Sequence, residues 1–314
     1  MDSSDLQKLA EHTRSMREAG VALLLASGFL ALFLFTPLGP KEAGPAPVAA
    51  APVIPDAFAK VSVDAKAAVV YDVTTKQILY AKNADAQLPL ASLTKLLTVY
   101  AALSELSPTT PITIPADATR LDGPHVFNAG QTFALNDLAR LTLTASLNDG
   151  ATAIAEAVAS RQNLSQGDML AGAAASLGLS QTYAVNGSGL DVNTVISGGY
   201  GSARDLAVLA GALVAQAPDI ALSTTESSAQ AVSEGGTVFK VLNTDPMVGV
   251  ISRLLLSKTG YTDLAGGNLA LVFDAGMGHP VAVVVLGSSQ KARFTDGMAL
   301  VAATLAHFAG VASL

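Results

Sequence analysis

The sequence predicts an α/β fold of the α+β class, in which strands from both ends of the folded region form one antiparallel sheet and helices lie between them. At the start of this region, Ala65–Asp72 and Gln77–Ala81 are two strand-like runs separated by a short polar turn. Near its end, Leu269–Phe273 and Val281–Leu286 flank a turn that contains Gly, His and Pro. Most of the sequence between these two pairs has the apolar spacing of helices.

The helices are expected in order along the chain. The first begins at Ser92, where Pro89 marks the entry and an apolar run follows. A loop-rich section with many Pro and Gly residues then extends to Gln131. Asn186–Asp191 is expected to be a turn or loop. The other predicted helices cover 135–145, 151–158, 169–177, 203–214 and 294–308.

The composition is that of a folded protein without cysteine. The 314 residues are 50% hydrophobic and 14% charged, which excludes disorder throughout the chain. The formal net charge of −7 argues against nucleic acid as a partner. The lack of cysteine excludes disulfides, thiol catalysis and cysteine-based zinc sites.

An uncharged segment near the N-terminus predicts a membrane anchor. No charged residue lies between Ala19 and Pro40, and the apolar core Val21–Phe35 is near the lower length limit for a membrane span. Three basic residues precede this segment, so the positive-inside rule places residues 1–18 in the cytoplasm as a tail and residues 19–37 in the membrane. A cleaved signal peptide is the alternative, although no small-x-small site directly follows the apolar core.

Residues 38–59 are rich in Pro, Ala and Gly, which is typical of an extended, semi-rigid linker. The folded domain is therefore expected to cover 60–314, with a helical part at roughly 92–240.

Ser92 and Lys95 are the first candidate catalytic pair. They are three residues apart at the start of a predicted helix, so both side chains lie on one face. Serine is a weak nucleophile until a base removes its proton, and a lysine can be that base where burial or a nearby cation lowers its pKa. The helix N-terminus also offers N–H groups to a developing oxyanion.

Two further motifs follow this pair. Ser146-Leu-Asn148 precedes a predicted helix, and Lys258-Thr-Gly260 follows an apolar run. Ser-x-x-Lys, Ser-x-Asn and Lys-Thr-Gly in this order form the signature of penicilloyl-serine enzymes. A second Ser-x-x-Lys at Ser288–Lys291 follows a predicted strand and is expected to be a chance match.

From about Ala65 to Leu305 the chain resembles the serine-type D-alanyl-D-alanine carboxypeptidases, which are the low-molecular-mass penicillin-binding proteins. Besides the motifs, the stretches that support this resemblance are 80–95, 186–191, 200–207, 258–266 and 283–287. The resemblance implies a five-stranded antiparallel sheet flanked by helices, with an all-helical subdomain.

The resemblance also implies a role for each motif residue. Ser92 would be the acylated nucleophile and Lys95 its general base. Ser146 would relay a proton between the leaving amine and the two lysines, and Asn148 would orient Lys95 and the substrate backbone. Lys258 would keep a positive potential in the cleft, which would also lower the pKa of Lys95.

The remaining implied residues would bind the substrate. Lys258, Thr259, Gly260 and Tyr261 are implied substrate-binding residues: Thr259 would contact the terminal carboxylate, and the backbone N–H groups of Ser92 and Tyr261 would form the oxyanion hole. Arg293, just after the last strand, would bind the same carboxylate, but a solvated arginine at a helix start fits the sequence equally well. Two departures from the family pattern, Leu147 and Gly150, leave the shape of the cleft rim open.

The sequence therefore predicts a single-pass protein of the bacterial cytoplasmic membrane with an extracytoplasmic, periplasmic D,D-carboxypeptidase domain. It would act on peptidoglycan stem peptides and be acylated by β-lactam antibiotics. No metal or cofactor is expected, because the histidines are scattered and no other catalytic motif is present. The alternatives are a D,D-endopeptidase, a class A-like β-lactamase, and a catalytically poor peptidoglycan-binding protein.

A class A β-lactamase uses a glutamate to activate the deacylating water, and in the family pattern an asparagine follows this glutamate four residues later. Glu156, Glu226 and Glu234 lie between the second and third motifs, and none is followed by asparagine at that spacing. The sequence thus favours a peptidase over a β-lactamase.

Overall fold

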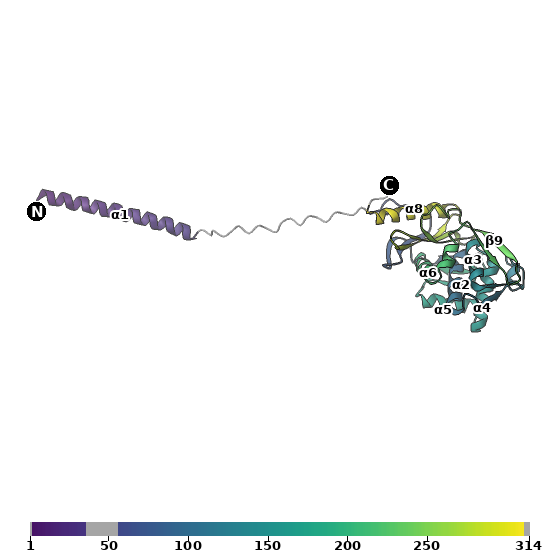
Figure 1. Cartoon of the computed structure of the whole chain (residues 1–314). Coiled ribbons are helices and arrows are strands. Elements are labelled where there is room, and N and C mark those ends of the chain that lie inside the picture. Colours follow the sequence, from purple (N-terminus) through teal and green to yellow (C-terminus); the bar gives the residue numbers. More distant parts are fainter. Residues whose placement is uncertain (1, 36–55, 311–314) are drawn as a thin grey trace. The chain divides into compact units, whose positions relative to one another are not determined.

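The computed structural model describes residues 2–35 and 56–310, and the chain divides into two compact units, Met1–Val53 and Ile54–Leu314 (Figure 1). The predicted linker, 38–59, lies outside the described residues except for its last four. Of these four, Ala57 and Phe58 are buried, and the ring of Phe58 packs against Tyr80 and His307. Side-chain packing of the second unit therefore starts slightly before residue 60.

The first unit contains one long helix, α1 (Ser3–Phe35). A tail at 1–18 and an apolar segment at 19–37 were expected as separate parts, but the helix runs without a break from the tail into the apolar segment as far as Phe35, the last described residue there. The tail is rich in good helix formers such as Leu, Glu, Lys and Arg, which explains its helical structure. Residues Ser4–Leu32 are long and apolar enough to cross a membrane, a property that a signal sequence near the N-terminus would share.

The second unit is built on a five-stranded antiparallel sheet, as predicted. Its strand order is β10-β11-β12-β1-β2, so the central strand β12 lies beside β1 from the other end of the unit. The strands are β1 (Ala67–Asp72), β2 (Gln77–Lys82), β10 (Leu254–Thr262), β11 (Gly266–Asp274) and β12 (Pro280–Ser288). The order leaves β10, which contains the Lys-Thr-Gly motif, at one edge.

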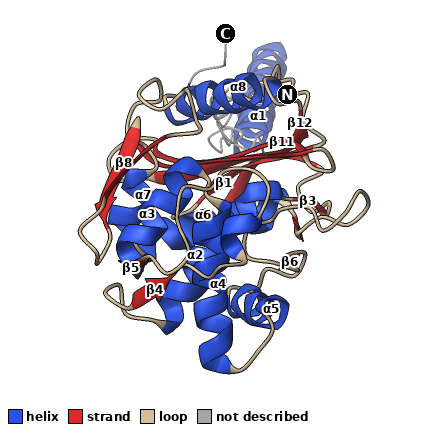
Figure 2. Ribbon diagram, turned by 90° about the vertical axis from the view of Figure 1, so that its right-hand side faces the viewer, coloured by secondary structure: helices blue, strands red, loops and turns tan. Residues whose placement is uncertain are grey.

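Both faces of the sheet are covered by helices (Figure 2). The helical part on one face comprises α2 (Thr94–Glu105), α3 (Leu135–Ala145), α4 (Asn148–Gln162), α5 (Gln166–Ser176), α6 (Ala203–Gln216) and α7 (Pro218–Ser223). The other face packs against α8 (Ala292–Phe308). Because side chains alternate along a strand, Ala67 and Val69 of β1 join the core under the helical part, whereas Ala68 and Val70 join the core under α8.

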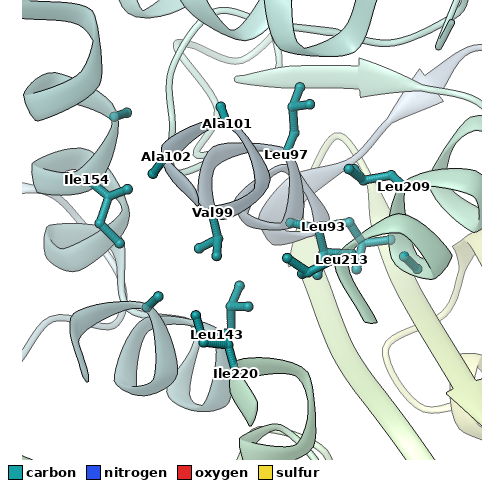
Figure 3. Packing of buried hydrophobic residues seen from close by; sticks show 14 of the residues in the cluster. Leu93, Leu97, Val99, Ala101, Ala102, Leu143, Ile154, Leu209, Leu213 and Ile220 are labelled. Atoms are coloured by element: carbon teal, nitrogen blue, oxygen red, sulfur yellow. The ribbon is translucent and has the colours of Figure 1, made fainter. Parts of the chain in front are cut away.

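Helix α2 runs through the middle of the larger core. In Figure 3, Val99 points toward Leu143 and Ile220, whereas Ala102 faces Ile154. All of these side chains are almost completely buried. The first turn of α2 is thereby fixed by packing on several sides, and this turn bears the candidate catalytic lysine.

Several short elements were not predicted, because two- to five-residue strands give little periodic signal. Besides α7, these are β3 (Leu88–Pro89), β4 (Pro111–Thr113), β5 (Thr132–Ala134), β6 (Tyr183–Ala184), β7 (Gly199–Gly201), β8 (Ser228–Val232) and β9 (Val238–Leu242), together with 3₁₀ turns at Ala91–Leu93 and Ala118–Arg120. The pairing of β3 with β7 holds the segment that leads into the candidate site.

Candidate active site

Ser92 lies on the 3₁₀ turn that precedes α2, two residues before the α-helix begins at Thr94. The helix was expected to begin at Ser92 itself. The difference preserves the contact, because residues three apart lie directly above one another in a 3₁₀ turn. The Nζ atom of Lys95 is 2.8 Å from the Ser92 Oγ atom. Ala91, just before the serine, has a positive φ of 48°, a backbone conformation that is strained for a residue with a side chain.

Lys95 is completely buried, and its amine has three partners. These are the Ser92 Oγ atom, the Asn148 Oδ1 atom at 2.8 Å and the Ser188 carbonyl oxygen at 2.7 Å. Burial lowers the pKa of Lys95 to about 7, and the nearby Asp149 carboxylate acts in the opposite direction. The amine can therefore be neutral near pH 7.

A neutral Lys95 amine would direct its lone pair at Ser92. Such an amine has two N–H groups and one lone pair. Two of its three partners are carbonyl oxygens, which accept hydrogen bonds but cannot donate them. The Ser92 hydroxyl is the partner that can donate, so the arrangement suits transfer of the serine proton to Lys95.

Asn148 is fixed from both sides of its amide group. Its Oδ1 atom accepts from Lys95, and its Nδ2 atom donates to the Asp122 carbonyl oxygen at 2.7 Å. The backbone N–H of Asn148 donates to the Pro124 carbonyl oxygen, also at 2.7 Å. The loop around Asp122 thus determines how Asn148 faces the lysine.

Ser146 and Lys258 form a second hydrogen-bonded pair at the site. Ser146 ends α3 in the left-handed conformation, with φ 59°, and its Oγ atom lies 2.9 Å from the Lys258 Nζ atom. Burial, Lys95 and Arg293 lower the pKa of Lys258 well below its ordinary value. A charged Lys258 was expected to contribute to the lowered pKa of Lys95. The structure instead assigns that shift to burial, because Lys258 is itself buried and readily loses its proton.

Arg293 is buried with only 8% of its surface exposed, so the prediction of a solvated arginine is wrong. Its Nη1 atom donates to the Gly260 carbonyl oxygen at 2.7 Å, and its guanidinium lies 4.7 Å from the centre of the Phe294 ring. Its Nε atom has no hydrogen-bond partner among the described residues. Because a guanidinium stays protonated near neutral pH, Arg293 supplies a fixed positive charge at the β10 edge.

The last residues of β10, Thr259 to Tyr261, complete the site. The Thr259 hydroxyl lies 2.6 Å from the Thr244 hydroxyl. A Cβ atom at Gly260 would lie only 3.2 Å from the Ser92 backbone nitrogen. Glycine therefore allows the backbone of β10 to approach the turn that contains Ser92. Tyr261 is 46% exposed and lies at the rim.

Leu147 and Gly150 do not shape the rim. Leu147 is 2% exposed, and Gly150 is buried inside α4. A Cβ atom at Gly150 would overlap the Thr142 hydroxyl oxygen, which explains why the smallest residue occupies this position. The departures from the family pattern noted at these two positions therefore affect the core rather than the cleft.

Four groups at the site were not identified from the sequence: the backbone carbonyls of Ser188 and Asp122, and the side chains of Thr244 and Asp149. The carbonyl of Ser188 lies in the Asn-Gly-Ser-Gly loop, and the two glycines were a usable signal of close backbone contact. The other three lie in or beside loops and are ordinary polar residues, so the sequence contains no comparable signal for them.

The second Ser-x-x-Lys is structural. The Ser288 hydroxyl donates to Asp296 at 2.7 Å, and Lys291 is exposed just before α8. The three glutamates considered as deacylation bases, Glu156, Glu226 and Glu234, are all exposed. Within the part of the chain that the structure describes, the side chains of these glutamates form no ion pair with a site residue.

Comparison with known proteins supports one family. A family model described as D-alanyl-D-alanine carboxypeptidase matches residues 54–290. The chain is similar to D-alanyl-D-alanine carboxypeptidase DacD from Escherichia coli, at 31% identity over 243 residues, which are 72% of this chain and 59% of that protein. It thus spans about three fifths of the length of that relative.

Two further similarities agree with this family. A D-alanyl-D-alanine endopeptidase from Pseudomonas aeruginosa is 30% identical over 241 residues, which are 74% of each chain. The structure of penicillin-binding protein D2 from Listeria monocytogenes in its ampicillin-bound form superposes with a TM-score of 0.66 at 28% identity, covering 78% of this chain and 98% of that one. With its matching fold and its three ordered motifs, the chain belongs to the D-alanyl-D-alanine carboxypeptidase family.

Proposed function

We propose that the chain is a serine D,D-carboxypeptidase that removes the terminal D-alanine from peptidoglycan stem peptides through an acyl-enzyme on Ser92. The observation that supports this most strongly is the environment of Lys95. Its buried amine, with a pKa of about 7, faces two carbonyl oxygens and one hydroxyl. This arrangement makes a general base directed at one serine.

The proposed acylation step uses both pairs of residues. Lys95 removes the proton of the Ser92 hydroxyl, and the Ser92 Oγ atom attacks the carbonyl carbon between the two D-alanines. The backbone N–H groups of Ser92 and Tyr261 donate to the oxygen that becomes negative. The bond from the carbonyl carbon to the D-alanine nitrogen then breaks, and the proton taken up by Lys95 reaches the leaving amine through Ser146, which accepts a hydrogen bond from Lys258. Water then hydrolyses the ester and restores the free serine.

The terminal carboxylate of the substrate would bind along β10. Thr259 and Thr244 place two hydroxyl groups together, and the guanidinium of Arg293 contacts the same strand at Gly260. A hydroxyl and a nearby guanidinium suit a carboxylate. This would explain a preference for substrates with a free C-terminus.

Labelled penicillin tests this function. We expect it to form a covalent adduct on Ser92 that turns over slowly, because none of the three candidate glutamates lies in the cleft to activate water. The ampicillin-bound structure of the Listeria relative supports a β-lactam as a ligand for this cleft. Mass spectrometry of the labelled peptide locates the adduct.

The adduct should be absent in Ser92→Ala and unchanged in Ser288→Ala, the matched control in the chance motif. Label on Ser288, or rapid catalytic hydrolysis of penicillin, would contradict the proposal. The second result would favour a β-lactamase.

A D,D-endopeptidase is the second candidate, because the Pseudomonas aeruginosa relative is described as one. The two activities differ in the leaving amine. In a carboxypeptidase it belongs to the terminal D-alanine, and in an endopeptidase it belongs to the second peptide of a cross-link. Incubation of the protein with purified sacculi separates them. We expect free D-alanine as the product, and conversion of cross-linked dimers into monomers without D-alanine release would identify an endopeptidase.

We also propose that α1 anchors the chain with its N-terminus in the cytoplasm, since the basic residues precede the apolar part of the helix. A reporter enzyme fused after Leu314 should then be active only outside the cytoplasm, and high salt should not extract the protein from membranes. A soluble mature chain that begins near residue 50 would instead support cleavage of a signal peptide.

A further inference from the structure

Asp149 is a completely buried carboxylate that the mechanism above does not use. It lies in the first turn of α4, directly after Asn148. Its Oδ2 atom accepts hydrogen bonds from the backbone N–H groups of Val126 and Phe127, both at 2.8 Å, and its Oδ1 atom accepts from Gly150 at 2.8 Å. A charge is costly to bury, and these three donors together with the N-terminal end of a helix offset that cost.

The two remote donors belong to the loop that orients Asn148. This loop, residues 121–127, binds Asn148 through the carbonyl oxygens of Asp122 and Pro124. Asp149 therefore binds the end of the loop at Val126 and Phe127. The part of the loop at Asp122 and Pro124 binds Asn148. Asn148 in turn contacts Lys95 through its Oδ1 atom. Hydrogen bonds at both ends of the loop, joined by the loop backbone itself, thus connect the Asp149 carboxylate to the Lys95 amine.

Asp149 also acts on Lys95 through its charge. Its carboxylate raises the pKa of Lys95 and so opposes the effect of burial. Around the second lysine, Lys95 and Arg293 lower the pKa of Lys258, and Asp245 raises it. Each buried amine of the cleft therefore has one buried aspartate that favours its charged form.

We propose that Asp149 is a positioning residue of this site, whose carboxylate fixes the 121–127 loop and thereby Asn148, and whose negative charge acts on the amine of Lys95. The inference rests on the proposed function, because its effect is seen through acylation of Ser92. It predicts two separable consequences of changing Asp149. Loss of the hydrogen bonds lowers the maximal rate, and loss of the charge moves the pH dependence.

The test compares Asp149→Asn with the wild-type full-length chain in membranes, by following acylation with a fluorescent penicillin as a function of pH. Asparagine has no charge, and its single acceptor oxygen cannot replace both carboxylate oxygens, which accept from Val126, Phe127 and Gly150. With the carboxylate removed, Lys95 loses its proton more easily, so the acid limb of the profile should shift to lower pH. The plateau rate should fall about 10- to 100-fold, since small displacements of catalytic groups cost rates of this order.

Asp205→Asn is the matched control. Asp205 is also a buried aspartate in the first turn of a helix, and its Oδ2 atom also accepts from a remote loop, at Gln181 N and Thr182 Oγ1. It makes no contact with the Lys95 amine. Asp205→Asn should lower the melting temperature and leave the acid limb in place. Asp149→Asn would give the same result if the role of Asp149 were purely structural.

Asp149→Glu provides a second variant in case the asparagine variant does not fold. Glutamate keeps the charge but moves the carboxylate away from Val126 and Phe127, so the plateau should fall while the acid limb stays close to that of the wild type. An unshifted limb in Asp149→Asn, or a full plateau rate in Asp149→Glu, would overturn the inference alone. Failure of the wild-type chain to acylate would overturn the proposed function and this inference with it.

Discussion

Lys95→Arg is expected to abolish acylation of Ser92 while leaving the chain folded. The reaction requires a base that is neutral near pH 7, and the amine of Lys95 meets this condition because burial lowers its pKa to about 7. A guanidinium stays protonated in proteins and cannot accept the serine proton. General base catalysis contributes about 100- to 10,000-fold, so the rate of labelling by penicillin should fall by this factor. Circular dichroism checks that the fold is kept.

The wild-type enzyme should show the same dependence on a neutral amine in its pH profile. Below pH 7 the amine of Lys95 is increasingly protonated, so the acylation rate should rise as the pH increases through about 7 and then level off. Lys82→Arg serves as the control, because Lys82 on β2 donates to the Val63 carbonyl oxygen outside the cleft. A Lys95→Arg variant that is labelled at the rate of Lys82→Arg would remove Lys95 from the role of base.

The sheet could be predicted from the sequence because its central strands are long and apolar. Val281–Leu286 is buried on both faces and therefore forms a continuous apolar run, which is recognisable without any neighbour. The helices α2, α3 and α6 were located for a similar reason. The shorter strands escaped prediction because their pairing depends on residues far away in the sequence, as with β3 and β7.

The catalytic side chains of the site could be predicted because they occur at fixed spacings in the sequence. Ser92 and Lys95 meet because residues three apart lie on the same face of both an α-helix and a 3₁₀ turn. The backbone groups that complete the surroundings of Lys95 have no such signature. Any residue type can supply the carbonyl of Ser188 or Asp122, and only the folded chain brings these atoms to the amine.

Electrostatic effects were the least predictable feature. The sequence shows that two lysines and an arginine belong to the motifs, but it does not show how deeply each is buried. Burial lowers the pKa of both lysines, whereas Arg293 keeps its charge despite being buried. The sequence thus identified the basic residues of the site, whereas the burial that sets their charge depends on the fold.

Gly189→Ala should reduce acylation strongly although residue 189 has no side chain and takes no part in the chemistry. Gly189 follows Ser188, has a positive φ of 73°, and lies so close to Ala91 that a Cβ atom would overlap the Ala91 carbonyl oxygen. Either the Ser188 carbonyl must move away from Lys95, or the strained turn that holds Ser92 must move. We expect the acylation rate to fall about 100-fold, as for displacements of about 1 Å in other active sites.

Gly178→Ala separates this displacement from simple backbone strain. Gly178 has a similar φ of 70°, but no atom lies within 4 Å of the position its Cβ would take. Its replacement should therefore cost only the strain of alanine in the left-handed region, about 1–2 kcal/mol of unfolding free energy, with no change in acylation rate. Thermal unfolding and penicillin labelling of both variants test this. Equal acylation rates in the two variants would show that contact between the Ser188 loop and the Ala91 turn does not position the catalytic pair.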